Sequence, residues 1–82
     1  MKINFIWVRE PNSNQKKAVE NNIINWTEII EKACHQDVVK CTLSIEGPLE
    51  TLLSGNVECS CGKKILSFNG NEFGDKLEPR WY

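Results

Sequence analysis

Two cysteines separated by one residue, in the segment Cys59-Ser60-Cys61-Gly62, are the part of this sequence best suited to chemistry. Side chains two positions apart on a β-strand point to the same side, so the two thiols would lie together. The glycine that follows allows the backbone to turn so that its amides face the sulfur atoms. Thiols held in this way can bind a metal ion, exchange with a disulfide, or pack in a core.

A metal site needs further ligands, and the sequence offers them near the middle of the chain. Cys34 and Cys41 have six residues between them, and His35 is adjacent to the first. Cys34, Cys41, Cys59 and Cys61, with His35 as a substitute for Cys34, are therefore candidate ligands of one structural zinc ion. The hairpin of Cys59 and Cys61 resembles one half of a zinc ribbon, although a zinc knuckle of that kind has two residues between its cysteines. That resemblance implies metal binding by these two thiols.

The same cysteines also fit two interpretations without a metal ion. Cys34 would end a helix and Cys41 would lie on the inward side of a strand, where small apolar side chains are expected, so both are candidate packing thiols. Cys59 and Cys61 are alternatively a candidate redox pair, whose thiolates the following two lysines would favour. No helix start accompanies this pair, in contrast to the C-x-x-C redox motifs, so catalysis by these thiols is the weaker hypothesis.

No other group makes a positive case for catalysis. His35, the one histidine of the chain, would cap the C-terminus of a helix, where the helix dipole favours a protonated imidazole. Asp37 and Glu46 have no carboxylate partner at a catalytic spacing. The sequence has no phosphate-binding glycine loop, no metalloprotease helix motif and no serine nucleophile elbow. We therefore expect a protein that is not an enzyme.

The longest element that would position these groups runs from Ser13 to His35. Residues at alternating steps of four and three form one apolar stripe along it: Val19, Ile23, Trp26, Ile30 and Ala33. This stripe predicts a single amphipathic helix of roughly 20 residues. Asn12, followed three residues later by Gln15, predicts its N-cap.

The remaining segments favour short strands on either side of the helix. Lys2 to Arg9 is apolar on both faces, which predicts a central strand. Val39 to Glu46 alternates between apolar and polar residues, as a half-buried strand does. Leu49 to Leu53 is ambiguous between a helical turn and a strand.

Turn residues divide the last third of the chain. Ser54-Gly55-Asn56 predicts a turn, after which residues 57–61 and 65–68 would pair as a hairpin. Asn69-Gly70-Asn71 predicts a second turn before a short strand at 72–73. The fold class predicted is α+β, with one long helix packed on a small, mostly antiparallel sheet of three to five strands. Residues 1–82 would form one domain, with 75–82 as a candidate flexible tail.

Composition limits the classes of function. Ten basic and eleven acidic residues give a net charge of -1, so no general field attracts nucleic acid or an anionic membrane. No stretch approaches the roughly 18 apolar residues of a membrane-spanning helix, and the first residues do not have the pattern of a signal peptide. We therefore expect a cytoplasmic protein, and its richness in Asn, Ile and Lys is typical of an AT-rich bacterial or phage genome.

These observations favour a small non-catalytic protein-binding module or inhibitor that occupies a site on a larger partner, as immunity and phage anti-defence proteins do. The candidate contacts are an acidic helix face and the aromatic end of the chain: Glu20, Glu28, Glu31, Trp81 and Tyr82. The first alternative is a zinc-stabilised module that contacts nucleic acid or a nucleic-acid enzyme. The second is a thiol-redox protein that uses Cys59 and Cys61.

Overall fold

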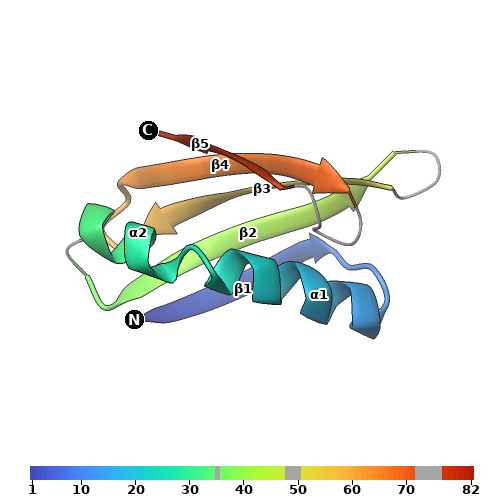
Figure 1. Cartoon of the computed structure of the whole chain (residues 1–82), viewed down its shortest axis with the longest axis horizontal. Coiled ribbons are helices and arrows are strands. Elements are labelled where there is room, and N and C mark those ends of the chain that lie inside the picture. The colour runs from blue at the N-terminus through green and yellow to red at the C-terminus, as the bar shows by residue number, and fades with distance from the viewer. Residues whose placement is uncertain (35, 48–50, 72–76) are drawn as a thin grey trace.

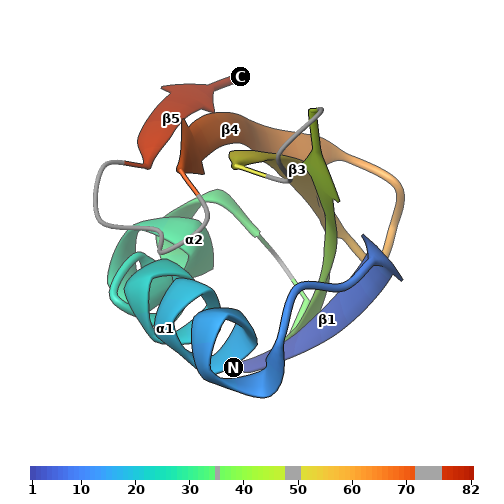
Figure 2. The ribbon, with the colours of Figure 1, turned by 90° about the vertical axis from the view of Figure 1, so that its right-hand side faces the viewer.

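The computed structural model describes residues 1–34, 36–47, 51–71 and 77–82. Its elements follow the chain in this order: β1 (Lys2–Arg9), α1 (Ser13–Ile24), α2 (Thr27–Ala33), β2 (Val38–Glu46), β3 (Leu52–Cys59), β4 (Lys64–Asn71) and β5 (Glu78–Trp81). Both helices lie on the same face of one curved sheet (Figures 1 and 2). The architecture is therefore α+β, as the sequence predicts.

The five strands lie side by side in sequence order, β1-β2-β3-β4-β5. β1 and β2 are parallel, and the two helices form the crossover that a parallel pair requires. β2, β3, β4 and β5 then form an antiparallel meander. The mixed sheet is thus mostly antiparallel, with its one parallel pair at the β1 margin.

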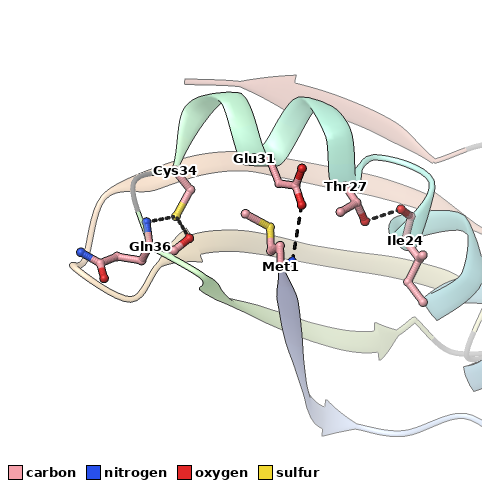
Figure 3. Close-up of polar contacts among 6 residues, drawn as sticks. All are labelled: Met1, Ile24, Thr27, Glu31, Cys34 and Gln36. Carbon is pink, nitrogen blue, oxygen red and sulfur yellow. Dashed lines mark hydrogen bonds and ion pairs between the residues drawn. The ribbon is translucent and has the colours of Figure 1, made fainter.

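The prediction of one long helix is wrong, because the helix is interrupted between α1 and α2. Trp26 has φ -88° and ψ 1°, outside the regular helix, and its amide donates to the Ile23 carbonyl at 2.9 Å, three residues back. The Thr27 hydroxyl donates to the Ile24 carbonyl (Figure 3). A side chain that bonds this carbonyl competes with the backbone ladder, and the neighbouring asparagine and β-branched residues have low helix propensity.

The apolar stripe nevertheless faces the core along both helices. Val19, Ile23 and Ile30 are fully buried, and Trp26 and Ala33 pack against the same cluster. The Trp26 ring meets Phe68 of β4 edge to face, with ring centroids 5.6 Å apart and an interplanar angle of 64°. Asn12 is the N-cap residue of α1, and its side chain accepts a hydrogen bond from the Gln15 amide. The break therefore changes the direction of the helix without removing its buried face.

β1 lies at the margin of the sheet, so the prediction of a central strand is wrong. Ile3, Phe5 and Trp7 pack against the core beneath the helices. Ile6 and Val8 point to the opposite face, where 45% and 71% of their surfaces are exposed. The second apolar face of this strand thus has no partner within the described part of the chain.

Two segments predicted as turns are instead strand. Gly55 and its neighbours lie in β3, and residues 69–71 lie in β4, which extends the predicted hairpin at both strands. A Cβ atom at Gly55 would lie 2.5 Å from Cζ of Phe68 and in contact with the Thr42 carbonyl. This glycine therefore marks a close approach between strands instead of a turn.

The predicted strand from 39 to 46 is confirmed as β2, whose inward side chains Val39, Cys41, Leu43 and Ile45 are buried. The segment considered as a flexible tail, 75–82, contains β5. The predicted strand at 72–73, part of the ambiguous segment from 49 to 53, and His35 lie outside the described residues.

Candidate functional site

Three of the four cysteines gather where α2 ends and where β3 turns into β4. Cys34 is the C-cap residue of α2, with an extended backbone that leads the chain away from the helix. Cys59 is the last residue of β3 and lies opposite Val39 of β2. The turn after it is tight, because the Gly62 amide donates to the Cys59 carbonyl at 2.8 Å and Gly62 has a φ of 94° that favours glycine.

The sulfur atoms of Cys34 and Cys59 lie 2.8 Å apart, and the Cys34 thiol is the donor of the hydrogen bond between them. Both side chains are buried, with 9% and 3% of their surfaces exposed. Figure 3 shows the Cys34 sulfur against the backbone of Gln36, whose amide donates to it at 3.4 Å. The fold thus brings a helix end and a strand end together through two thiols.

The environment divides the two thiols into a proton donor and a thiolate. The hydrogen bond from Cys34, followed by one from the Cys61 amide, lowers the pKa of Cys59 to about 6, although burial opposes this change. Burial, followed by the hydrogen bond to Cys59, raises the pKa of Cys34. A proton held on Cys34 therefore stabilises negative charge on Cys59, which is the ionised form that reacts as a nucleophile.

Cys61 is the accessible member of the group. It is exposed on the turn, and both its amide and its thiol face the sulfur of Cys59. A cavity of about 300 Å³ opens beside this turn on the side of the sheet away from the helices. Its lining comes from the adjoining ends of three strands and the turn: Asn4, Val38, Lys40, Glu58, Cys59, Ser60 and Gly62.

Cys41 lies apart from this group, one step along the sheet. In the strand register it is opposite Phe5 of β1 and Val57 of β3, whereas Cys59 is opposite Val39. It is fully buried, and burial raises its pKa to about 12, with a further increase from the charge of Glu20. This is the environment of an unreactive packing thiol.

The predicted zinc ligands are therefore only partly brought together. Across residues 1–34, 36–47, 51–71 and 77–82, no three Cys, His, Asp or Glu side chains are grouped so that they could hold a metal ion. His35, the alternative ligand, is outside these ranges. The structural zinc ion stays a prediction, which zinc analysis of the purified protein would test.

The side chains predicted to contact a partner lie in different settings. Glu20 is half-buried and accepts a hydrogen bond from the indole of Trp7. Glu28 is exposed on α2, and Glu31 lies 3.5 Å from the terminal ammonium group of Met1 (Figure 3). The aromatic residues at the end of the chain, Trp81 and Tyr82, are 41% and 74% exposed. Two of the three glutamates, Glu20 and Glu31, thus have a polar partner within the chain.

A further surface, which the sequence analysis did not identify, is the sheet face opposite the helices. Two cross-strand rows occupy its centre, and they consist of uncharged polar side chains: Thr42, Asn56 and Ser67 in one row, and Ser44, Ser54 and Asn69 in the other. Ile6 lies beside the first row on β1, and Val8 lies at the adjacent register shift. We call these eight residues the outer sheet face.

The alternation of apolar and polar residues in β2 indicates that its polar side chains, Thr42 and Ser44 among them, lie on this surface. The rest of its polar residues belong to β3 and β4, whose segments 54–56 and 69–71 were predicted as turns. Because these segments are strands in the structure, the polar residues of β2, β3 and β4 lie side by side on one face.

Comparisons with known proteins give no match: no family model fits the chain, and no curated protein or solved structure is similar to it. No helix among the described residues is both long and apolar enough to cross a membrane. A functional proposal therefore depends on the geometry and chemistry of the chain itself.

Proposed function

We propose that this chain is a small, non-catalytic protein-binding module that occupies a larger protein through its outer sheet face. The observation that supports this proposal is the pair of exposed side chains Ile6 and Val8 beside six uncharged polar residues on an uncovered sheet. The helices cover only the other face (Figure 2). The depletion of charged side chains at the centre of this surface is a feature that it shares with the cores of protein interfaces.

Charge distribution supports the same surface. Outward positions of a solvated sheet usually include many Lys and Glu side chains, which keep a protein soluble and prevent association. Here such residues surround the two rows instead of interrupting them. Lys40 is opposite Glu58 at one end of the strands, and Glu46 lies at the other end. At the margins of the sheet, Arg9 of β1 is opposite Ser44, and two residues of β5, Arg80 and Glu78, are opposite Ser67 and Asn69. The two central rows between them contain none. A partner that supplies amide and hydroxyl groups over these rows and an apolar contact over Ile6 and Val8 would satisfy this pattern.

The proposal extends the contacts expected from sequence. The exposed residue Glu28 remains a candidate contact that is separate from the outer sheet face, because α2 covers the inner side of the sheet (Figure 1). Tyr82, exposed after β5, also remains a candidate contact. Binding measurements on matched variants, one on each side of the sheet, can therefore show which of these regions contacts the partner.

The test compares two substitutions of the same kind on opposite sides of the molecule. Asn56→Lys places a charge at the centre of the outer sheet face, and Glu28→Lys changes an exposed residue on α2. Because both positions are exposed, we expect each variant to unfold within about 0.5 kcal/mol of the wild type. A partner captured by immobilised wild-type chain and then purified should bind Glu28→Lys normally and Asn56→Lys at least roughly tenfold more weakly.

Equal binding by both variants would refute the outer sheet face as the interface. Loss of binding in Glu28→Lys alone would assign the interface to the helix side. If sedimentation showed a complex that contains only copies of this chain, the surface would mediate self-association, and the proposal of a larger partner would be wrong.

A further inference from the structure

We propose that Cys34 and Cys59 form a reversible intramolecular disulfide, and that Cys61 is the thiol through which an external disulfide oxidises them. This function is separate from partner binding at the outer sheet face, and it pairs Cys59 with a residue 25 positions away instead of with its neighbour in the motif. The argument depends on the distance between two sulfur atoms, on the access to each thiol and on the path of electrons.

Distance favours the pair. The two sulfur atoms are 2.8 Å apart, which is closer than two unbonded sulfur atoms normally pack. A disulfide bond is about 2.0 Å long, so closure requires an approach of less than about 1 Å. Cys34 follows the end of α2 and Cys59 ends β3, so neither residue lies in the interior of a helix or strand that would resist this movement.

Access explains the need for a third cysteine. Cys34 and Cys59 are buried, so a molecule as large as oxidised glutathione cannot reach their sulfur atoms directly. Cys61 is exposed, and its thiol faces Cys59.

The exchange begins at the exposed thiol. The Cys61 thiolate attacks one sulfur atom of oxidised glutathione, whose disulfide bond breaks, and the departing glutathione thiolate takes up the proton that Cys61 lost. Cys59 then loses its thiol proton and attacks the sulfur of Cys61, and the second glutathione leaves as a thiolate that takes up this proton. A disulfide between Cys59 and Cys61 is the product of this step.

The last step transfers the bond to the buried pair. Cys34 attacks the sulfur of Cys59, the bond between Cys59 and Cys61 breaks, and the proton of Cys34 passes to Cys61. In total, two protein thiols lose two electrons and two protons, and one glutathione disulfide becomes two glutathione thiols. The short distance between the sulfur atoms of Cys34 and Cys59 supports this last step.

The position of Lys63 adds to this environment. Its ammonium group lies 3.5 Å from the carbonyl of Ala33, at the end of α2, and therefore in the same region as Cys34. This contact satisfies a carbonyl group at the C-terminal end of α2, next to Cys34. Reduction by excess glutathione would follow the same steps in reverse.

The experiment treats the reduced full chain with oxidised glutathione in a chelator-containing buffer without air. Intact mass, thiol alkylation after denaturation and peptide mapping then give the product. We expect the loss of two hydrogen atoms, two remaining thiols, and a disulfide that maps to Cys34 and Cys59. Cys41→Ser should give the same product at the same rate, because Cys41 lies outside the group. Cys61→Ser should form the same disulfide at least roughly tenfold more slowly.

Three results would overturn the proposal. Four alkylatable thiols after treatment, or a final disulfide that maps to Cys59 and Cys61, would show that the buried pair does not close. An unchanged rate in Cys61→Ser would remove the exposed thiol from the path. Since mapping uses the wild-type chain, the first conclusion does not depend on the folding of any variant.

Discussion

The indole nitrogen of Trp7 donates a hydrogen bond of 3.1 Å to Oε1 of Glu20, and this contact joins β1 to α1. Trp7 packs against the core from the margin of the sheet, and Glu20 is half-buried on the helix above it. A carboxylate on an acidic helix face therefore has a structural partner. The bond holds the helix over the parallel strand pair.

Removal of this acceptor should destabilise the fold. We expect Glu20→Ala to lower the free energy of unfolding by about 1–2 kcal/mol, because the half-buried indole N–H loses a charged acceptor. Glu20→Gln retains an acceptor oxygen and should lose less than half as much. Urea denaturation of the two variants and the wild type gives both values. Equal losses in the two variants would mean that charge, and not the hydrogen bond, is what matters at this position.

A methyl group at Gly55 should be poorly tolerated. The new Cβ would meet the Thr42 carbonyl and lie 2.5 Å from Cζ of Phe68, so Gly55→Ala forces both the neighbouring strand and the buried ring to shift, at a cost of about 1–3 kcal/mol. Ser54→Ala, on the outer side of the same strand, is the matched control and should change the free energy of unfolding by less than about 0.5 kcal/mol.

A double variant tests the cause. In Gly55→Ala with Phe68→Leu, the shorter side chain removes the contact of the methyl group with the ring, although the contact with the Thr42 carbonyl remains. The double variant should therefore recover part of the loss and be more stable than the sum of the two single changes predicts. Strict additivity of the free energies would contradict the proposed contact.

The stability of the reduced protein should depend on pH through Cys59. Its pKa is about 6 in the folded chain and about 9 in the reference state, so folding favours the thiolate. The resulting stabilisation is complete above pH 9 and is lost as the pH falls through 6. The raised pKa of Cys34 acts only above its reference value of 9.0, outside this range.

We therefore expect the difference in unfolding free energy between the reduced wild type and Cys59→Ser to increase from pH 6 to pH 9. Chemical denaturation at several pH values with a phosphine reductant measures this difference. Cys41→Ser is the control, since Cys41 remains protonated throughout this range. A difference that is independent of pH would show that Cys59 is not ionised in the folded chain.

Metal removal tests the zinc prediction. Because the core consists of apolar side chains from both helices and all strands except β5, we expect the reduced chain to keep its far-UV circular dichroism spectrum and thermal midpoint in excess chelator. Zinc analysis of protein purified without added metal should be made on the same sample. One zinc ion per chain, with unfolding in chelator, would instead support ligation by the four cysteines.

The spacing of apolar residues was sufficient to predict which side of an element is buried where that spacing follows a regular period. The stripe of Val19, Ile23 and Ile30 faces the core, and β2 alternates as its sequence indicates. Both features depend only on neighbours within the same element. The same local information was insufficient at Trp26, where a side-chain hydrogen bond interrupts a helix whose apolar period continues unbroken.

Features that depend on distant residues were not predictable from spacing. Gly55 looks like a turn residue, and only its position against Phe68 explains why it lies in a strand. Cys34 and Cys59 are 25 residues apart, so their contact requires the completed packing of α2 against the sheet. The spacing suggested Cys61 as the partner of Cys59, whereas the sulfur atom 2.8 Å from Cys59 belongs to Cys34, at the end of α2.

The exposure of β5 has a consequence for motion within the fold. None of its four residues is buried, so pairing with β4 and few other contacts hold this strand in place. Separation of β5 therefore costs less free energy than separation of any strand that contributes to the core. Amide hydrogen exchange should begin along this margin, with Trp81 moving into water before Trp26 does. The strands beneath the helices are thus the more stable part of the sheet, and β5 is the strand that opens at the lowest free-energy cost.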